Sequence, residues 1–422
     1  MKKKVVLSIF IILISFLQNS CGSKRISKKI IVASSGKIES LDPARANTLK
    51  AIQLISSLGD TLYELNSNGE LIPELASGMP VISKDRLQIT INLRKNVFFH
   101  DGTAFNSNAM KFTFDRFKRI GTMNYILGNK IKSIETPSEY SVIINLNKPS
   151  SSLNGLLTSV NLTPISPTFY KQYSDKFLNE KFVGTGKYVL TSFSNEVQSI
   201  DPYLNYWGEK PLNKGVNFVG YSNSSSLFGA LKSKQIDVLL SNSIDDSQRK
   251  SLNNLSKNKQ FNEGNSPFTE LSFISLKTSS YPLSNLNLRL ALAKSLNRKL
   301  ISEKVSYGLR KPSRSIIPPI LKKDNQELWP KYDYLEARRL LQKENYCNGN
   351  ILKIPLTYRS NVPADKLIAL TWQEEIKSSL KDCIDIELNG VESTTVYKNL
   401  SLGIYTAVLL DWTGAYSDPE AY

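Results

Sequence analysis

The feature that most restricts the fold is the alternation of strand-like and helix-like segments in the second half of the chain. From Val216 the order is strand, helix, strand, and from Asp333 helices and strands alternate up to the apolar run "YTAVLLDW". Such alternation is typical of α/β units with largely parallel sheets. The first half is richer in strands, with "LQITINL" at residues 87–93 and a hairpin-like pair at 184–193 and 197–201. Since 422 residues exceed one ordinary core, we expect an α/β fold with two mixed-sheet lobes.

Few residues in the sequence are suited to catalysis or to holding a metal. His100 is the only histidine, which excludes a site built from several histidines, and its place before Asp-Gly indicates a turn residue. No Gly-x-Ser-x-Gly elbow occurs, and "FVGTGKYVL" lacks the first glycine and the Ser/Thr of a phosphate loop. A cleft at strand ends between two lobes is suited to ligand binding instead. We therefore expect a binding protein without enzymatic activity or cofactor, whose loop aromatics (Tyr203, Tyr206, Trp207, Trp412, Tyr416) belong to the core or line the cleft.

Residues 1–20 have the composition of an export signal. A basic start is followed by the apolar segment Val5 to Leu17, which is short for a membrane span. Small residues and Cys21-Gly22-Ser23 come next, and this order resembles a bacterial lipoprotein processing site. We expect Cys21 to be acylated and residues 21–29 to form a tether, which places the protein in the periplasmic or extracytoplasmic space on the envelope membrane. The alternative is an ordinary secretory signal with an incidental cysteine.

The formal charge of +17 raises the question of nucleic-acid binding. Apart from short runs near the N-terminus, the basic residues stand singly among serine and asparagine. This dispersion favours a solvated surface, and we expect no nucleic-acid partner.

Two cysteines remain after the export signal, Cys347 and Cys383, and each precedes a strand-like run. One helical segment, residues 364–381, lies between the two runs. Parallel strands joined by one crossover helix usually lie side by side with their starts at the same edge, so the two cysteines could form a disulfide. Two buried free thiols are the alternative.

Several motifs together are similar to one family, the family 5 solute-binding proteins of ABC importers for oligopeptides, dipeptides and nickel. They extend from about Ile30 to the last residue in the order usual for the family and comprise "ESLDPARANT", "LIPELA", "FFHDGTAF", "VGTGKYVL", "YWGEKP" and "LRLALAKSLNRKLI". The resemblance implies a type II periplasmic-binding fold that closes around its ligand by hinge bending. It implies a first lobe at residues 30–268, with an extra subdomain at about 49–180, and a second lobe at 269–422. The second lobe is expected to be incomplete, because the segment that returns to the first lobe in the family is missing.

The resemblance also suggests where a ligand binds. The segment "DWTGAYSDPEAY" matches a family segment with the pattern Trp-x-x-Asp-x-x-Asp-Pro, which faces the cleft. In dipeptide-binding relatives that first Asp holds the ligand's amino group, but here the position is Ala415; Asp411 or Asp418 could replace it, although Asp418 is also suited to a turn. Arg359 matches an arginine that holds the ligand's carboxylate, and the alternative for it is a surface charge. The residues that we expect to bind ligand are Ser35, Gly36, Arg359, Asp411, Trp412, Thr413, Gly414, Ala415 and Tyr416.

The function that we expect is that of a lipid-anchored, monomeric receptor. It would bind a peptide or similar small polar solute and deliver it to the permease and ATPase subunits of an ABC importer. An envelope sensor or scaffold with the same fold, or a receptor for a nickel-carrier complex, are the alternatives. A hydrolase is disfavoured because the sequence has one histidine and no nucleophile elbow.

Overall fold

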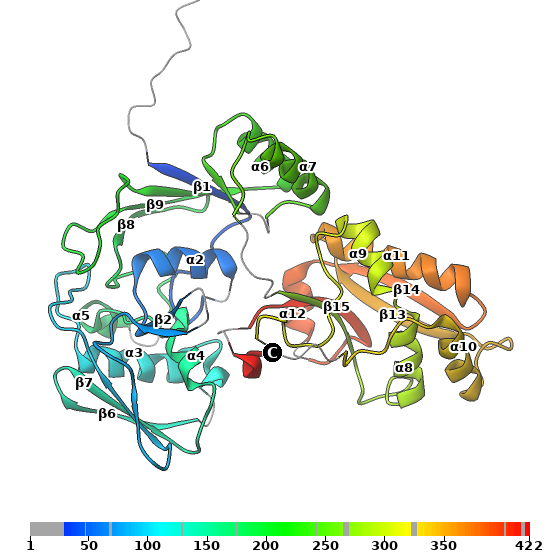
Figure 1. The fold of residues 1–422 in the computed structure, drawn as a ribbon, viewed down its shortest axis with the longest axis horizontal. Helices are drawn as coiled ribbons and strands as arrows, with labels where there is room; N and C mark the ends of the chain where they lie inside the picture. Colours follow the sequence, from blue (N-terminus) through cyan, green and yellow to red (C-terminus); the bar gives the residue numbers. More distant parts are fainter. Residues whose placement is uncertain are drawn as a thin grey trace, which may run out of the picture.

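The computed structural model describes residues 29–46, 48–66, 70–127, 130–173, 176–240, 243–264, 270–321, 327–400, 402–414 and 418–422. The expected export signal, Cys21, Ala415 and Tyr416 lie outside these residues. In Figure 1 the elements up to α7 (Asp246–Lys257) form one part of the molecule, and those from β12 (Leu271–Leu276) to β15 (Ala407–Trp412) form another beside it. No strand described before residue 265 pairs with a strand described after residue 269. We call these parts the first and second lobe; the domain boundaries given above stay predictions.

The first lobe contains a five-stranded mixed sheet in the order β11-β1-β10-β9-β8. Its strands are β1 (Ile30–Ser35), β8 (Tyr188–Phe193), β9 (Val197–Pro202), β10 (Val216–Tyr221) and β11 (Val238–Leu239). β1 lies between β10 and β11 and is parallel to both, whereas β8 and β9 form the predicted antiparallel hairpin. Helix α2 (Leu49–Leu58) packs on one face of the sheet through Leu54 and Ile55, while α6 (Ser224–Lys232) and α7 (Asp246–Lys257) cover the other face. Helix α2, which falls within the predicted subdomain range, therefore packs on the main sheet.

A second, antiparallel sheet lies below the first in Figure 1, in the order β4-β5-β7-β6. Helix α3 (Ser107–Ile120) covers this sheet. The helix begins after Asn106, whose side chain caps it by accepting a hydrogen bond from the backbone N–H of Ala109. The predicted stripe of Met110, Phe114 and Phe117 is buried against this sheet, as helical periodicity requires. The other elements of this part are β2 (Tyr63–Leu65), β3 (Leu71–Pro73), β4 (Val81–Ile82), β5 (Gln88–Asn92), α3 (Ser107–Ile120), η1 (Asn124–Ile126), β6 (Ile131–Ser138), β7 (Ser141–Leu146), α4 (Leu153–Leu157), η2 (Val160–Leu162), α5 (Pro167–Tyr170) and η3 (Lys171–Tyr173).

The second lobe has a four-stranded sheet in the order β12-β15-β13-β14. The strands are β12 (Leu271–Leu276), β13 (Leu352–Arg359), β14 (Ile384–Val391) and β15 (Ala407–Trp412). β13 is parallel to both β14 and β15, and β12 is antiparallel to β15. Its helices are α8 (Leu286–Ser295), α9 (Arg298–Ser306), α10 (Tyr334–Lys343), α11 (Pro363–Ser379) and α12 (Ser393–Leu400), and η5 (Pro419–Ala421) follows β15. Trp372 of α11 is a large, buried side chain of the main core of this lobe. Cys347 and Cys383 are joined by a disulfide.

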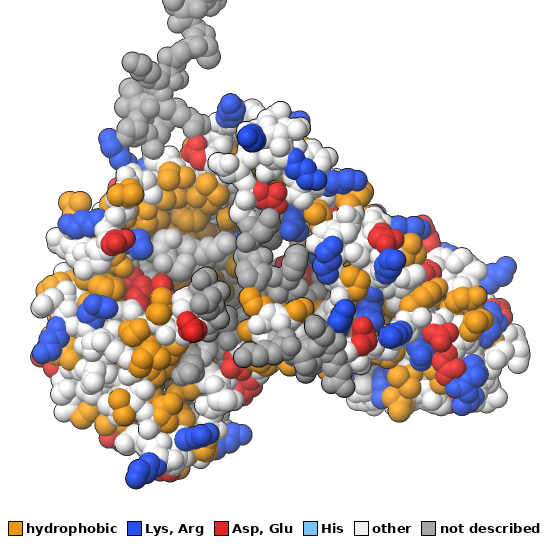
Figure 2. All heavy atoms as spheres, in the orientation of Figure 1, with side chains coloured by type: hydrophobic (Ala, Val, Ile, Leu, Met, Phe, Trp, Pro, Cys, Tyr) orange, Lys and Arg blue, Asp and Glu red, His pale blue; other side chains and the backbone are white. Residues whose placement is uncertain are grey.

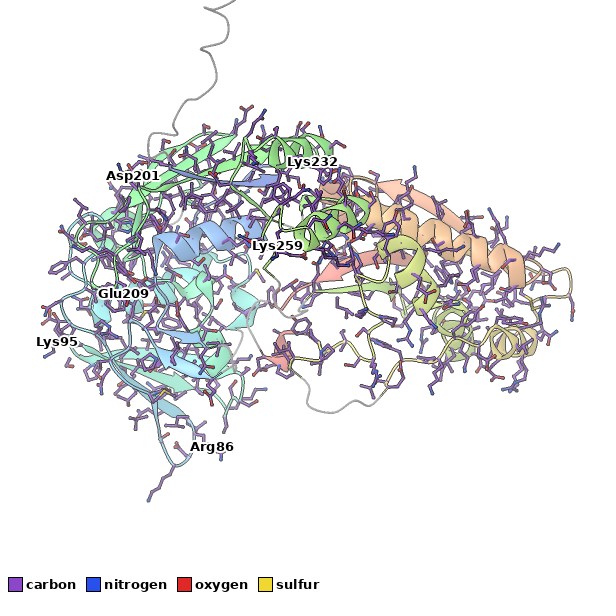
Figure 3. The ribbon with its side chains drawn as sticks, turned by 45° about the horizontal axis from the view of Figure 1, so that its top comes forward. Arg86, Lys95, Asp201, Glu209, Lys232 and Lys259 are labelled. Atoms are coloured by element: carbon purple, nitrogen blue, oxygen red, sulfur yellow. A yellow bond between two sulfur atoms is a disulfide. The ribbon has the colours of Figure 1, made fainter. Side chains whose placement is uncertain are left out.

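Surface charge is dispersed on the face shown in Figure 2, where Lys and Arg are interspersed with Asp and Glu. In Figure 3 the labelled side chains of Arg86, Lys95, Glu209 and Lys232 lie on the outside of the first lobe, and all four are exposed. This arrangement agrees with the expectation that most of the charge is solvated.

Candidate functional site

The first wall of the candidate site lies at the carboxyl end of β1. In open α/β sheets, ligands bind outside the carboxyl ends of parallel strands, where neighbouring crossovers diverge. Ser35 ends β1, and the N–H of Gly36 donates to the carbonyl of Tyr221 (2.8 Å) at the end of β10. Gly36 has φ +74°, and a Cβ there would lie 2.8 Å from the ammonium of Lys50, so the position favours glycine.

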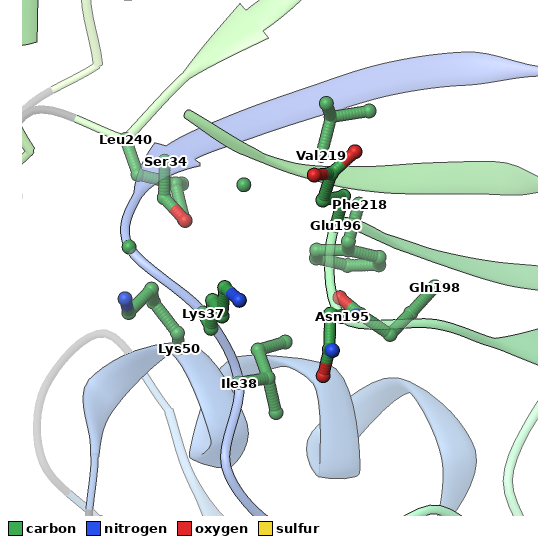
Figure 4. Close-up of a pocket in the computed structure, with 12 residues that line it drawn as sticks. Ser34, Lys37, Ile38, Lys50, Asn195, Glu196, Gln198, Phe218, Val219 and Leu240 are labelled. Carbon is green, nitrogen blue, oxygen red and sulfur yellow. The ribbon is translucent and has the colours of Figure 1, made fainter. Parts of the chain in front are cut away.

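Lys50 is a residue of this wall that the sequence did not single out. Its Nζ donates to the carbonyl of Ser35 (2.6 Å), and burial lowers its pKa. Figure 4 shows Lys50 beside a cavity of about 10 Å³ between the sheet and α2. This volume suits about one water molecule. The cavity is therefore too small for a solute.

The second wall is formed at the carboxyl ends of β13 and β15, which are parallel neighbours. Arg359 is the last residue of β13, and Asp411 and Trp412 end β15, with Thr413 and Gly414 following. The predicted ligand-binding residues thus lie at strand ends in both lobes. Ser35–Gly36 lie at the end of β1 in the first lobe, and Arg359 and Asp411–Gly414 lie at the ends of β13 and β15 in the second lobe. In Figure 1 the ends of β1 and β15 lie on the sides of the lobes that face each other.

Arg359 is buried, so the reading of this residue as a surface charge is wrong. Its guanidinium binds Asp365 at two points (Nε–Oδ2 2.7 Å, Nη2–Oδ1 3.0 Å), Asp411 through Nη2 (2.5 Å) and the Tyr397 hydroxyl through Nη1 (3.0 Å). Burial alone disfavours the charged guanidinium, but hydrogen bonds to the two carboxylates outweigh it and raise the pKa of Arg359. The pKa of Asp365 is raised by burial against the opposing effect of Arg359. Contact of Arg359 with a solute stays a prediction.

A second arginine links this wall to the first lobe. Arg310 lies after α9 and donates through Nε to Asp246 of α7 (3.0 Å) and through Nη1 to Ser272 of β12 (3.4 Å). Ser272 pairs with Asp411 across the sheet. Desolvation, and next the negative charge of Asp411, raise the pKa of Glu270, which lies just before β12. No feature of the sequence marked Arg310 or Glu270, because their partners are distant in the chain.

The segment after β15 also contacts the first lobe. The Asp418 side chain accepts a hydrogen bond from the backbone N–H of Glu420 (2.9 Å), so Asp418 serves as a turn residue. Glu420 forms an ion pair with Lys130 (2.7 Å), and Ala421 packs against the core beneath α3. The Nε1 of Trp412 donates to the Ala421 carbonyl (2.7 Å), which fixes the indole beside this interlobe contact.

Residues 70–422 match the family of bacterial extracellular solute-binding proteins, family 5 Middle. The chain belongs to this family. The glutathione-binding protein GsiB of Escherichia coli O6:K15:H31 (strain 536 / UPEC) is 26% identical over 360 residues, which cover 84% of this chain and 69% of that protein. GsiB of Salmonella typhimurium has the same identity and coverage. Family 5 proteins are periplasmic carriers of ABC transporters and are not enzymes.

Solved structures show the same fold as this family 5 protein. DppA of Helicobacter pylori, in complex with peptide STSA, has a TM-score of 0.80 at 23% identity over 94% of this chain and 80% of that one. NikA of Brucella suis, in complex with Fe(III)-EDTA, has a TM-score of 0.81 at 23% identity over 93% of this chain and 81% of that one. The fold is therefore the type II periplasmic-binding fold, as the sequence predicted. Within the described residues, no helix combines the length and apolar character that crossing a membrane requires, and no group of three or more His, Cys, Asp or Glu is arranged to hold a metal.

His100 and the loop aromatics of this family 5 protein have structural contacts. The Nε2 of His100 lies 3.0 Å from the Gly186 carbonyl in a turn, as predicted. Asp60, a buried carboxylate, accepts from the Tyr206 hydroxyl (3.1 Å), the Trp207 Nε1 (2.9 Å) and the Thr185 hydroxyl (2.9 Å). Burial raises the pKa of Asp60, and these hydrogen bonds oppose the rise. Tyr206 and Trp207 thus hold a buried carboxylate of the first lobe.

Glu74, a neighbour of this network, makes stability depend on pH. Its Oε2 accepts from the N–H and hydroxyl of Thr61 (both 3.2 Å), and burial, followed by the charge of Asp60, raises the pKa of Glu74 to about 8. An acid with a raised pKa in the folded state ionises first in the unfolded state as the pH rises. The free energy of unfolding therefore falls between the unfolded pKa and the folded pKa of that acid. Glu74→Gln removes the charge and keeps the acceptor. We expect the variant to match the wild type near pH 4 and to be more stable by about 1–3 kcal/mol above pH 8, measured by urea unfolding.

The control for this prediction is Glu209→Gln, which removes an exposed carboxylate near Trp207. The free energy of unfolding of this variant should equal that of the wild type at every pH. A Glu74→Gln difference that fails to grow between pH 5 and pH 8 would show that Glu74 is not held neutral by its surroundings.

Proposed function

We propose that the protein is the lipid-anchored receptor of an ABC importer and that it binds a peptide or similar small polar solute between its lobes. The solute contacts the segments at Ser35–Gly36, Arg359 and Asp411–Tyr416 and passes to the permease when the lobes open. The observation that carries this proposal is that Ser35–Gly36, Arg359 and Asp411–Gly414 lie at the carboxyl ends of parallel strands in both lobes of a family 5 fold. The solutes named for the relatives, glutathione for GsiB and a peptide for DppA, support the choice of a peptide-like solute.

A thermal-shift screen tests the solute class. Purified protein is heated with defined dipeptides, tripeptides, glutathione and nickel–histidine, because a ligand that binds only the folded state stabilises it by about 2.7 kcal/mol at a concentration of 100 Kd. We expect a rise in Tm with at least one peptide-like compound and an accompanying change in tryptophan fluorescence, since Trp412 lies at the second wall. A response to the nickel complex alone would assign the protein to metal-carrier uptake, and no response to any compound would refute the proposed solute class.

Anchoring is tested separately in cells. Mass spectrometry of the mature N-terminus should find Cys21 as an acylated first residue, and Cys21→Ala should release the protein from the membrane fraction. An unmodified N-terminus at another residue, with the protein in the soluble fraction, would support the secretory-signal alternative.

A further inference from the structure

The loop at residues 203–215, which joins β9 to β10, carries the two most exposed large apolar side chains among the described residues. Leu212 is 105% exposed and Leu204 is 75% exposed, and the next most exposed, Tyr281, reaches 69%. One exposed leucine on a protein surface is ordinary. Two leucines that project this far from a single loop indicate a surface that meets another apolar phase.

The loop itself is held firmly to the first lobe. The Tyr203 hydroxyl donates to the Phe99 carbonyl (2.9 Å), and the Trp207 Nε1 donates to the buried Asp60 (2.9 Å). Near the other end, Asn213 donates to the hydroxyl of a β8 tyrosine (2.8 Å). The aromatic residues of the loop therefore point into the lobe while its two leucines point out. Because the loop is already ordered, contact with a surface does not have to order it first.

The loop lies where the predicted tether joins the fold. The N–H of Ile30, the first residue of β1, donates to the carbonyl of Gly215 (3.0 Å), and Lys29 forms an ion pair with Asp201. In Figure 3, Asp201 and Glu209 lie on the side of the first lobe away from the second lobe. The eight residue steps from Cys21 to Lys29 span at most about 29 Å when fully extended. An anchor at Cys21 therefore keeps this loop close to the membrane surface.

The charges around the two leucines are mainly positive. Lys210 and Lys214 are exposed, and Glu209 is the only carboxylate of residues 203–215. Residues 22–29 add four basic residues and no acidic one. Leucine side chains enter the boundary between headgroups and acyl chains, while flanking lysines extend their ammonium groups to anionic headgroups. A protein partner would instead require a closed apolar patch, and the aromatic rings that could form one are turned inward here.

We propose that this loop is a second membrane contact of the anchored receptor. Leu204 and Leu212 insert into the interface of a bilayer that contains anionic phospholipid, and Lys210 and Lys214 bind its phosphate groups. This inference rests on the proposed function, because it takes acylated Cys21 as the anchor. The contact orients the first lobe on the membrane. The candidate site at the carboxyl end of β1 lies at the opposite end of that strand from the tether, so the contact leaves it accessible to solute.

A fluorophore placed on the loop tests the contact. The acylated protein is reconstituted by its own anchor into vesicles of phosphatidylcholine, with or without phosphatidylglycerol. Leu212→Cys supplies a thiol for an environment-sensitive label, since the other cysteines are acylated or joined in the disulfide. The control is Leu402→Cys, a 67% exposed position in the second lobe. With phosphatidylglycerol we expect a blue shift at position 212 and quenching by nitroxide lipid about twofold or more above the control.

A charge variant tests the role of the lysines in the labelled Leu212→Cys protein. Lys210→Gln combined with Lys214→Gln should reduce the quenching on anionic vesicles and leave it unchanged on neutral ones, and added salt should have the same effect. Lys366→Gln combined with Lys381→Gln is the matched control, because it makes the same change in net charge at exposed sites of the second lobe. This control should behave as the parent protein.

The outcomes separate this inference from the proposed function. A label at position 212 that stays as exposed to water as the one at position 402, on protein shown to be acylated and vesicle-bound, would overturn the membrane contact and leave the receptor proposal standing. Equal quenching on neutral and anionic vesicles would overturn the role of the lysines. A response that disappears when the protein is diluted within the vesicles would assign the loop to a second copy of the chain and overturn the bilayer as its partner. Protein that is not acylated and does not float with vesicles would overturn both the anchored receptor and this inference.

Discussion

Replacing Arg116 with methionine is expected to destabilise the first lobe by about 3–5 kcal/mol, because it leaves a fully buried carboxylate without its counter-charge. Arg116 of α3 binds both oxygens of Asp42 (Nη1–Oδ1 2.8 Å, Nη2–Oδ2 2.6 Å), and the two side chains are 2% and 0% exposed. Asp42 belongs to the Leu-Asp-Pro motif of the sequence and also accepts from the backbone N–H groups of Ala44 and Leu178. The measurement is urea unfolding followed by circular dichroism.

A matched control on the same helix is Lys111→Met. Lys111 pairs with Asp115 at the surface, where loss of an ion pair costs about 0.5 kcal/mol. The double variant Asp42→Asn with Arg116→Met should be less destabilised than the sum of the single variants, since it leaves no unpaired charge in the core. If Arg116→Met costs no more than Lys111→Met, the buried pair does not hold α3 to the loop at Asp42.

Local patterns of the sequence account for most of the secondary structure. Helix α3 was predictable because Asn106 supplies a cap and the apolar residues recur at helical spacing, and both signals lie within the helix itself. The parallel pairing of β13 and β14 was also predictable, since a single crossover helix between two apolar runs restricts how they can be arranged. In both cases the information is contained in one contiguous stretch of chain.

The details of the candidate site were less accessible, because they depend on contacts between distant segments. Arg359 was identified as a candidate, but its partner Asp411 is 52 residues away, and no local pattern shows that the pair is buried. Lys50 reaches the end of β1 only because α2 packs under the sheet, and nothing distinguishes it in the sequence from the other basic residues. Sequence reasoning thus identified the segments of the site, while the charge balance within it required the fold.

Removing the disulfide by replacing Cys347 and Cys383 together with alanine is expected to destabilise the second lobe by about 4 kcal/mol. The bond closes a loop with a sequence separation of 36, and its loss lets the unfolded chain sample more conformations. Both side chains are buried beside the starts of β13 and β14, so alanine introduces no polar group into that core. Urea unfolding followed by tryptophan fluorescence reports on this lobe because Trp372 is buried in the same core.

Reductant separates the effect of the bond from the effect of the side chains. Wild-type protein unfolded with a thiol reductant should approach the stability of the double variant, whereas the reductant should leave the double variant unchanged. The Arg116 variant affects the other lobe, so its destabilisation should add to that of the cysteine variant when the two are combined, because the sites share no contacts. A wild type whose stability is the same with and without reductant, and whose unfolded and unreduced form shows two free thiols, would mean that the cysteines are packed side by side without a bond.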